Sequence, residues 1–374
     1  MAKYRIAVIG HTGRGNYGHG LDNVWLEFPD RCEIVAVSDA DEKGRADAAK
    51  RLKVAKAYAD YRQMLDEAKP QIVAICPRHL DQHRDMAVAA AERGIHIFTE
   101  KPFCRTPAEA DQIIAACEKR TGPGNTTVKL TIAHQSRYGP KLQVVREIID
   151  SGQLGKVLEI RGRGKEDQRG GSEDLWVLGC HVFNLVNYFG GDPKWCSARV
   201  TQNGQPVTKA DVKPGNEGLG PLAGDRVDAM FGLDSGVTAY FSSQKSAGAG
   251  GDGRFGLQIF GSKGIIDYPF GYLPNVQLLA DPLWSPGRGK ANWVPVSSAG
   301  IGKPEPLKDG GIPAGNRAIV QDLFSAIEND RDPECDMYEA RTTIEMISAV
   351  FESHRTGGLA TFPLKTRENP LALL

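Results

Sequence analysis

The sequence of 374 residues lacks the apolar run of about eighteen residues that a membrane-spanning helix needs. It also lacks a surplus of charge of either sign, because 46 basic residues are matched by 46 acidic ones. A balanced charge gives no electrostatic reason to expect a nucleic acid or an anionic membrane as partner. We therefore expect no nucleic acid and no membrane, but a small molecule or a second copy of the chain.

Cysteine is scarce, and its spacing excludes two common uses. The number of cysteines is odd, and no C-x-x-C pair occurs; they are Cys32, Cys76, Cys104, Cys117, Cys180, Cys196 and Cys335. A disulfide framework and a zinc knuckle are both disfavoured, and no other metal-ligand spacing is recognised. The opening "MAKYRIAVIG" enters an apolar run at once, which leaves no room for a signal peptide. We expect a cytoplasmic protein with no metal.

What the sequence does contain is a regular alternation of short apolar runs with helical patterns over about its first 130 residues. The apolar runs read as buried strands at residues 5–9, 33–38, 71–76, 95–99 and 128–133. Strands that alternate with helices predict a parallel sheet with right-handed crossovers. The sequence therefore predicts an α/β domain over residues 1–133.

The pattern changes after about residue 134. Strand-like stretches such as "RVDAMFGLDSGVTAYFSSQ" and "GLQIFGSKGIIDYP", joined by turn residues, predict a hairpin-rich, mostly antiparallel open sheet. Helices are expected near residues 140–151, 174–189, 313–329 and 336–354, and long loops at 214–224, 246–253 and 299–315. The second domain, residues 134–374, is thus expected to be α+β.

A glycine cluster, "VIGHTGRGNYGHG", follows the first predicted strand. The register that begins at the strand end has Gly10, Thr12 and Gly15 in the three glycine positions, with Gly13 beside Thr12. Such glycines allow a tight turn and a close approach of backbone to a pyrophosphate, which then lies at a helix N-terminus. A merely flexible loop is the alternative, but the strand–loop–helix setting favours a dinucleotide.

Asp39 ends the second predicted strand, where an acid can hydrogen-bond a ribose 2′-OH. It lies farther from Gly10 than the usual ~20 residues, which the enlarged glycine loop explains. A turn or helix-capping acid is the alternative role. Lys43 and Arg45 follow closely and could accept a 2′-phosphate, so NAD is favoured while NADP stays possible.

The stretch "GIHIFTEKPFCRTPAEAD" (94–111) places Glu100, Lys101 and Pro102 directly after an apolar strand. In an open α/β sheet, ligands bind beyond the carboxyl ends of the strands. Together with the glycine loop, the "CPRHLDQH" turn and "GCHVFNLVNYFGGDP", this motif resembles the glucose–fructose oxidoreductase/inositol dehydrogenase/MocA family over most of the chain. The resemblance implies a Rossmann domain followed by an α/β domain whose open sheet often makes oligomer contacts, as a homodimer or homotetramer.

The resemblance implies that Lys101 lies beside the nicotinamide and the substrate hydroxyl. A base must take the hydroxyl proton when hydride leaves a secondary alcohol, and a cationic lysine can stabilise the developing alkoxide. His181 and Asn184 are three residues apart and share a helix face. His181 could act as general acid or base, since histidine titrates near neutral pH; a packed core histidine is the alternative.

The sequence departs from the family where acids usually flank this histidine, because Val177 and Asn184 occupy those positions. Asp174, two turns before His181 on a similar helix face, or Glu173 could supply the missing carboxylate; a helix N-cap is the favoured alternative for Asp174. Weaker candidates follow other strands. Cys76, Pro77 and His83 resemble the turn that the family places against the cofactor. Arg137 and Tyr138 are expected either to touch substrate or to tie the domains together. Arg163, Lys165, Glu166 and Asp167 could bind sugar hydroxyls or be only surface charges.

The leading hypothesis is an NAD(P)-dependent oxidoreductase that acts on a sugar, cyclitol or related polyol. Glycoside cleavage with tightly bound NAD that is recycled internally is a second hypothesis, compatible with the loss of the acid at Val177. A non-catalytic cofactor-binding protein is the third, and the presence of Lys101 and His181 argues against it. Turnover separates the third hypothesis from the others, and free NADH separates the first from the second.

Overall fold

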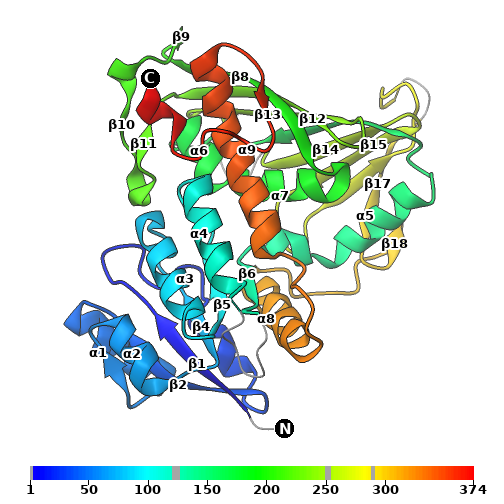
Figure 1. Cartoon of the computed structure of the whole chain (residues 1–374). Coiled ribbons are helices and arrows are strands. Elements are labelled where there is room, and N and C mark those ends of the chain that lie inside the picture. The colour runs from blue at the N-terminus through cyan, green and yellow to red at the C-terminus, as the bar shows by residue number, and fades with distance from the viewer. Residues whose placement is uncertain (1–2, 120–126, 249–253, 288–290) are drawn as a thin grey trace. The chain divides into compact units, whose positions relative to one another are not determined.

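The computed structural model describes residues 3–119, 127–248, 254–287 and 291–374 (Figure 1). Its contacts divide the chain into two compact units. Unit 1 comprises Met1–His134, Asn216–Gly220 and Ile312–Ile344, and unit 2 comprises Gln135–Gly215, Pro221–Gly311 and Glu345–Leu374. The expected boundary after residue 133 lies next to the first of these limits. The division into two domains that fold independently stays a prediction.

Unit 1 is built on a six-stranded sheet in the order β3-β2-β1-β4-β5-β6. Every neighbouring pair is parallel, which confirms the predicted α/β architecture. The strands are β1 (Tyr4–Ile9), β2 (Cys32–Ser38), β3 (Ala57–Tyr58), β4 (Ile72–Ile75), β5 (His96–Thr99) and β6 (Leu130–Ile132). Strands β4, β5 and β6 are buried along their whole length, as expected for a sheet covered on both faces.

The strand order reverses between β1 and β4, which makes their carboxyl ends the switch point where ligands bind in this fold. Four helices accompany the strands: α1 (Glu42–Leu52), α2 (Tyr61–Ala68), α3 (His83–Ala91) and α4 (Pro107–Cys117). Local sequence explains where three of them begin. The side chains of Asp41, Asp60 and Thr106 accept hydrogen bonds from backbone N–H groups in the first turns of α1, α2 and α4.

The glycine cluster does not lead into an α-helix, and this corrects the expectation that a helix N-terminus follows strand β1. Residues 11–23 form turns, and only a short 3-10 helix, η1 (Val24–Glu27), precedes β2. The cause lies in the sequence, because φ is positive at four glycines within eight residues: Gly13 (80°), Gly15 (89°), Gly18 (61°) and Gly20 (86°). An α-helix cannot include such residues.

Helix α8 (Ile312–Glu328) packs in unit 1 beside this segment. Phe324 stacks on Tyr4 of β1 with ring centroids 5.1 Å apart and meets Trp25 and Phe28 edge-on at 6.2 and 5.8 Å. These three contacts bury η1 against an aromatic cluster. A helix from the C-terminal part of the chain thus covers the place where the first crossover has no α-helix of its own.

Unit 2 contains an eleven-stranded sheet in the order β18-β17-β16-β15-β14-β7-β13-β12-β8-β19, with β9 paired to β8. Only β7 and β13 are paired in parallel among its described strands, so the predicted mostly antiparallel sheet is confirmed. Its strands are β7 (Val157–Arg163), β8 (Pro193–Gln202), β9 (Gln205–Pro206), β12 (Arg226–Leu233), β13 (Thr238–Gln244), β14 (Gly256–Gly261), β15 (Gly264–Pro269), β16 (Val276–Leu279), β17 (Trp293–Ser297), β18 (Gly300–Ile301) and β19 (Ala360–Thr361). A separate hairpin joins β10 (Lys213–Pro214) to β11 (Pro221–Leu222).

The helix expected at 174–189 is two helices, α6 (Ser172–Val177) and α7 (Gly179–Gly190). Leu178 separates them because its backbone, with φ −126° and ψ −37°, is not helical. Helix α7 lies on the sheet through Phe183, whose ring is 5.2 Å from Phe231 and 5.1 Å from Phe241. The other helices are α5 (Pro140–Asp150) and α9 (Met337–Thr356). Among the described residues, no helix is long and apolar enough to cross a membrane.

Candidate functional site

The switch point of unit 1 brings three predicted segments to one edge of the sheet. The glycine loop leaves β1, the Cys76–Pro77 turn leaves β4, and Glu100 and Lys101 leave β5. Backbone hydrogen bonds join these segments, since Cys76 N–H donates to Ile9 at 3.0 Å and Glu100 N–H donates to Ile75 at 2.9 Å. The segments are therefore held side by side by the sheet itself.

The glycine loop fits the close approach of a dinucleotide at one position above all. Beside Gly13 nothing lies within 4 Å of the place where a Cβ would project, so its backbone faces open space. At Gly15, by contrast, a Cβ would lie 2.2 Å from the backbone nitrogen of Arg78, so only glycine fits between the loop and the β4 turn. Gly10 is covered by the ring of Tyr17, which would lie 2.2 Å from an added Cβ.

Asp39 is fully buried and binds the glycine loop. Its carboxylate accepts from the Thr12 backbone N–H at 3.1 and 3.0 Å and from the Thr12 hydroxyl at 2.7 Å. The Tyr17 hydroxyl donates to it at 2.9 Å, and the Asp41 N–H at 3.0 Å. The predicted Thr12 and Asp39 are thus brought together directly. Burial, reinforced by the neighbouring charge of Asp39, raises the pKa of Tyr17 far above its usual value, so this phenol stays a donor.

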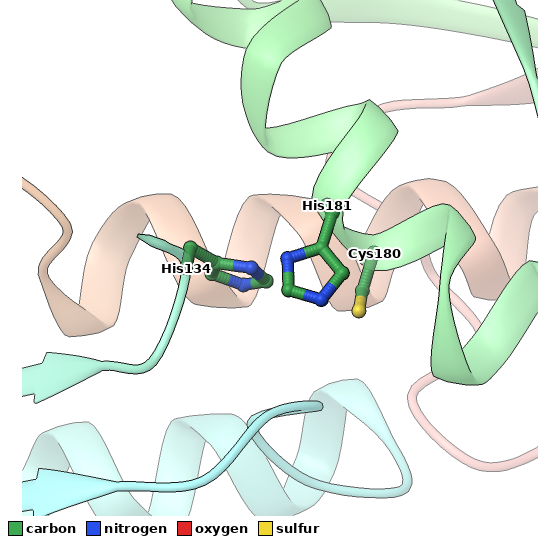
Figure 2. Close-up of side chains that lie close together, drawn as sticks. All are labelled: His134, Cys180 and His181. Carbon is green, nitrogen blue, oxygen red and sulfur yellow. The ribbon is translucent and has the colours of Figure 1, made fainter. Parts of the chain in front are cut away.

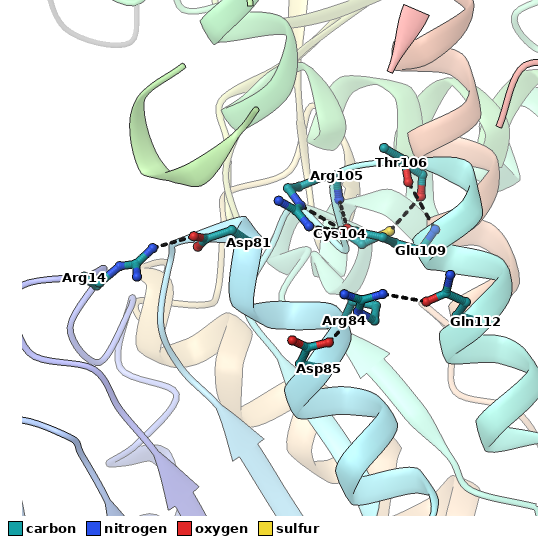
Figure 3. A network of polar contacts seen from close by, with 9 residues as sticks. All are labelled: Arg14, Asp81, Arg84, Asp85, Cys104, Arg105, Thr106, Glu109 and Gln112. Carbon is teal, nitrogen blue, oxygen red and sulfur yellow. Dashed lines mark hydrogen bonds and ion pairs between the residues drawn. The ribbon is translucent and has the colours of Figure 1, made fainter. Parts of the chain in front are cut away.

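Arg14 supplies a positive charge in the loop and is paired with Asp81 at the end of the turn after β4 (Figure 3). Figure 3 also shows the start of α4, where Thr106 caps the helix and Glu109 accepts from the backbone N–H of Arg105 at 2.9 Å. The hydroxyl and the carboxylate thus fix the first turn of α4. The segment between the end of β5 and α4, which carries Lys101, is consequently anchored at both ends.

Glu100 is fully buried, and both of its carboxylate oxygens are used. Oε1 accepts from the backbone N–H of His19 at 2.8 Å and lies 2.6 Å from its Nδ1, while Oε2 accepts from the N–H of Lys101 at 3.0 Å. Burial favours the protonated acid, but the contacts with His19 and the charge of Lys101 hold the pKa of Glu100 below its ordinary value. Lys101 is partly exposed, and its peptide bond to Pro102 is cis.

His83 ties the β4 turn to the β5 turn. Its Nε2 lies 2.7 Å from the carbonyl oxygen of Pro77, and its Nδ1 lies 2.9 Å from that of Pro102 and 3.2 Å from that of Phe103. The ring is buried, so these contacts replace hydrogen bonds to water. His83, which the sequence predicts to bind cofactor, therefore contacts backbone carbonyl oxygens of both turns.

His134 ends unit 1, just beyond β6, and is drawn in Figure 2 together with Cys180 and His181, which belong to unit 2. Burial and the nearby charge of Lys101 lower the pKa of His134 to about 3, so its imidazole is neutral at physiological pH. His134 is not among the residues predicted from the sequence. Its position, directly after the last strand of a parallel sheet, was the signal that could have identified it.

In unit 2, α7 carries the predicted His181 and Asn184 one helical turn apart. The imidazole of His181 lies against the ring of Phe270, with centroids 4.5 Å apart. Val177 ends the preceding helix α6, so the break at Leu178 separates it from His181. Asp174, expected to share a helical face with His181, lies on α6 as well, and that expectation is wrong because the two residues are on different helices.

Asp174 is not a helix N-cap, since Gly171 precedes the first turn of α6. Its Oδ2 accepts from the Ser243 hydroxyl at 2.5 Å and from the Glu166 N–H at 3.0 Å. Its buried Oδ1 has no hydrogen-bond partner among the described residues. Burial raises the pKa of Asp174. Through Glu166 the acid is linked to another candidate, because Arg163 Nε donates to the Glu166 carboxylate at 2.9 Å.

The remaining candidates of unit 2 make local contacts. Asp167 pairs with Arg169 at 2.6 Å, and the Arg137 guanidinium lies 3.9 Å from the ring centre of Tyr188. Arg137 and Tyr138 belong to the 3-10 helix η4 (Gln135–Tyr138), which precedes α5. The cation–π contact gives Arg137 a partner in unit 2.

Two further residues of the glycine loop, Tyr17 and His19, make contacts that were not predicted from the sequence. Tyr17 covers Gly10 and binds Asp39, and His19 binds Glu100. Neither occupies one of the three glycine positions, so the motif alone gave no reason to select it. The signal was their type, since polar aromatic residues are unusual in a flexible glycine-rich loop and need partners when buried.

Comparison with known proteins agrees with this organisation. Residues 4–123 match the Gfo/Idh/MocA family described as an oxidoreductase family with an NAD-binding Rossmann fold, and residues 142–267 match the GFO/IDH/MocA C-terminal domain. Levoglucosan dehydrogenase of Pseudarthrobacter phenanthrenivorans is 25% identical over 63% of this chain and 64% of its own length. Myo-inositol 2-dehydrogenase of Thermotoga maritima is 24% identical over 70% of this chain and 74% of its own length.

Solved structures share the fold over nearly the whole chain. An oxidoreductase domain protein from Kribbella flavida has a TM-score of 0.77 at 22% identity and covers 97% of this chain and 100% of its own. A levoglucosan dehydrogenase in complex with NADH and L-sorbose has a TM-score of 0.77 at 20% identity, with the same coverage. These similarities establish the two-part architecture.

Proposed function

Since the chain belongs to the Gfo/Idh/MocA oxidoreductase family, with its NAD-binding Rossmann fold at residues 4–123, we propose that it is an NAD-dependent dehydrogenase of a sugar, cyclitol or related polyol. The observation that carries the proposal is the place of Lys101, at the carboxyl end of β5 next to the switch point between β1 and β4. The names of relatives that act on levoglucosan and myo-inositol support this class of substrate.

Bound NAD would supply a hydride acceptor for the carbon of a secondary alcohol. The chain must then handle one proton, because oxidation to a ketone releases the hydroxyl hydrogen as H⁺. Lys101 is assigned to this oxygen: as a neutral amine it takes the proton, and as a cation it stabilises the alkoxide. His181 assists the proton transfer, and Asn184 on the same face of α7 binds a substrate hydroxyl.

The residues assigned to the cofactor lie along the switch-point edge. We assign the loop of Gly10, Thr12, Gly13 and Gly15 to the pyrophosphate, with Gly13 as its open position, and Asp39 to the adenosine ribose. The turn residues Cys76 and Pro77, with His83, Glu100 and Lys101, form the part of the edge assigned to the nicotinamide. NADP stays an alternative to NAD. The Arg45 guanidinium, which could accept a 2′-phosphate, donates to the backbone oxygen of Asp39 at 2.8 Å.

Substrate hydroxyls are assigned to Arg163 and Asp174, which are joined through Glu166. Asp174 is the sharper candidate because its buried Oδ1 is an acceptor that a sugar hydroxyl would satisfy. An acid at Asp174 is also the available substitute for the family carboxylate replaced by Val177.

We further assign the chain to the cytoplasm, as a homodimer or homotetramer. All seven cysteines are free and buried, which suits a reducing compartment. The open sheet of unit 2 carries exposed Arg161 and Tyr240 on neighbouring strands, and an arginine–tyrosine surface is typical of protein interfaces. Size-exclusion chromatography with light scattering tests the oligomer.

The test of the activity combines mass spectrometry of the purified protein, under native and denaturing conditions, with a polyol and glycoside panel followed by NADH absorbance. We expect NADH from a free polyol and a loss of about 100- to 10,000-fold in kcat for Lys101→Met. Lys50→Met, an exposed lysine on α1, is the matched control and should retain activity. Glycoside cleavage without net NADH would instead establish internal redox recycling, and absence of any turnover would leave a cofactor-binding protein.

A further inference from the structure

The partly exposed His19 and the buried Glu100 link two segments that the proposed reaction needs in a fixed arrangement. His19 lies in the glycine loop after β1, and Glu100 lies at the end of β5. One carboxylate oxygen receives both the backbone N–H and the imidazole Nδ1 of His19, at 2.8 and 2.6 Å. A carboxylate with no exposed surface holds such partners far more strongly than one in water.

Neighbouring residues restrain the loop side of this contact. A Cβ on Gly18 would lie 2.5 Å from Glu100 Oε1 and 2.6 Å from the carbonyl oxygen of Cys76, and φ at Gly18 is 61°. On the other side, the Asn316 side chain of α8 donates to the backbone oxygen of His19 at 3.0 Å. The loop is thus clamped at residues 18 and 19 between the ends of β4 and β5 and helix α8.

The second carboxylate oxygen of Glu100 reaches the residue proposed to do the chemistry. It accepts from the backbone N–H of Lys101 at 3.0 Å. One carboxylate therefore connects the loop assigned to the cofactor with the backbone of Lys101. Glu100 has no exposed surface, and its carboxylate joins these two segments, so the arrangement depends on the donors of its partner His19.

We infer that His19 is a positioning residue, which acts through Glu100 to hold the cofactor-binding loop and the Lys101 turn in one arrangement. The inference rests on the proposed function. Its consequence is that removal of the imidazole weakens cofactor binding even though His19 is not assigned any contact with the cofactor. Loss of a hydrogen bond to a buried charged group is expected to weaken NADH binding about 10-fold.

The charge on Glu100 gives the inference a signature that simple loss of packing would lack. The ionisable groups around this carboxylate are His19, Lys101, His134 and Cys76. Burial raises the pKa of Glu100, and the contacts with His19 together with the charge of Lys101 keep it low, so loss of the imidazole in His19→Ala should raise it. NADH affinity of that variant should then fall as pH falls through the raised pKa, because a protonated carboxyl is a poorer acceptor for the loop and for Lys101.

The experiment is a fluorescence titration of the full chain with NADH between about pH 5 and pH 9. This range covers the titration of histidine and of a carboxyl group whose pKa is raised by burial. Four proteins are compared: wild type, His19→Ala, His19→Asn and Arg93→Ala. The asparagine amide can place an N–H near the position of Nδ1 but cannot titrate. Arg93→Ala breaks an exposed ion pair with Asp66 elsewhere in unit 1 and serves as control.

We expect His19→Ala to bind NADH about 10-fold more weakly and to lose further affinity as the pH falls. His19→Asn should recover most of the affinity and show no such loss at low pH. Equal affinity and equal pH dependence in wild type and His19→Ala would overturn the inference. If His19→Ala does not fold, His19→Asn is compared with His19→Gln, whose longer side chain misplaces the donor; equal affinity of these two would also overturn it. If the wild type binds no NADH at all, the proposed function itself fails.

Discussion

The hydroxyl of Tyr17 donates to the buried carboxylate of Asp39 at 2.9 Å, while the ring of Tyr17 covers Gly10. With the N–H groups of Thr12 and Asp41 and the Thr12 hydroxyl, the acid has as many donors as its lone pairs accept. A ribose hydroxyl can therefore reach Asp39 only by replacing one of them. Tyr17 is the donor best suited to leave, because it gives a single side-chain hydrogen bond, whereas Thr12 donates through both its N–H and its hydroxyl and Asp41 donates from the backbone two residues away.

Replacing Tyr17 with phenylalanine should consequently tighten NADH binding. The variant keeps the ring but frees one lone pair of Asp39, so the ribose no longer has to displace a hydrogen bond worth about 1 kcal/mol or more. We expect Kd for NADH to fall about 3- to 10-fold, measured by fluorescence titration. Weaker binding would mean that Asp39 serves to shape the loop and that the ribose is held elsewhere.

Asp174 offers a separate test of the substrate assignments. In Asp174→Asn, an amide can keep the hydrogen bonds from Ser243 and Glu166 through its oxygen. It then presents N–H donors where Oδ1 now offers an acceptor. We expect KM for the polyol to rise about 10-fold or more, with Kd for NADH unchanged. Asp228→Asn, an exposed acid on β12, is the control; equal KM values for both variants would remove Asp174 from the substrate site.

The alternation of strands and helices in unit 1 could be predicted because its central strands, such as β4 and β5, are buried on both faces and so appear as continuous apolar runs. Strands β4 and β5, expected at 71–76 and 95–99, occupy Ile72–Ile75 and His96–Thr99. The absent helix after β1 could not be predicted in the same way. The pattern of residues 16–27 admits a helix, which the positive φ values at Asn16, Gly18 and Gly20 exclude.

The residues of the candidate site were also predictable only in part. The place of Lys101 followed from its position at a strand end, which fixes the edge of the sheet where it lies. The partners of Glu100 and Asp39 did not follow, because His19 and Tyr17 reach them through turns whose course depends on several glycines at once. The break at Leu178 was likewise hidden, since apolar residues continue through it and helical spacing alone cannot reveal a single non-helical residue.

His96 at the start of β5 predicts how unit 1 responds to acid. Its Nδ1 accepts from the Lys129 N–H at 3.0 Å, and burial, with the charge of Lys129, lowers the pKa of His96 to about 4. In the unfolded chain histidine titrates near 6.5, so between about pH 6.5 and 4 the unfolded state binds more protons and stability falls as pH falls. One such group contributes a slope of at most about 1.4 kcal/mol per pH unit to the free energy of unfolding.

His96→Asn keeps an acceptor for the Lys129 N–H but cannot be protonated. We therefore expect the free energy of unfolding of this variant, measured in urea, to lose that part of its dependence on pH. An unchanged slope over this window would mean that His96 is protonated in the folded protein or that other groups determine the acid response.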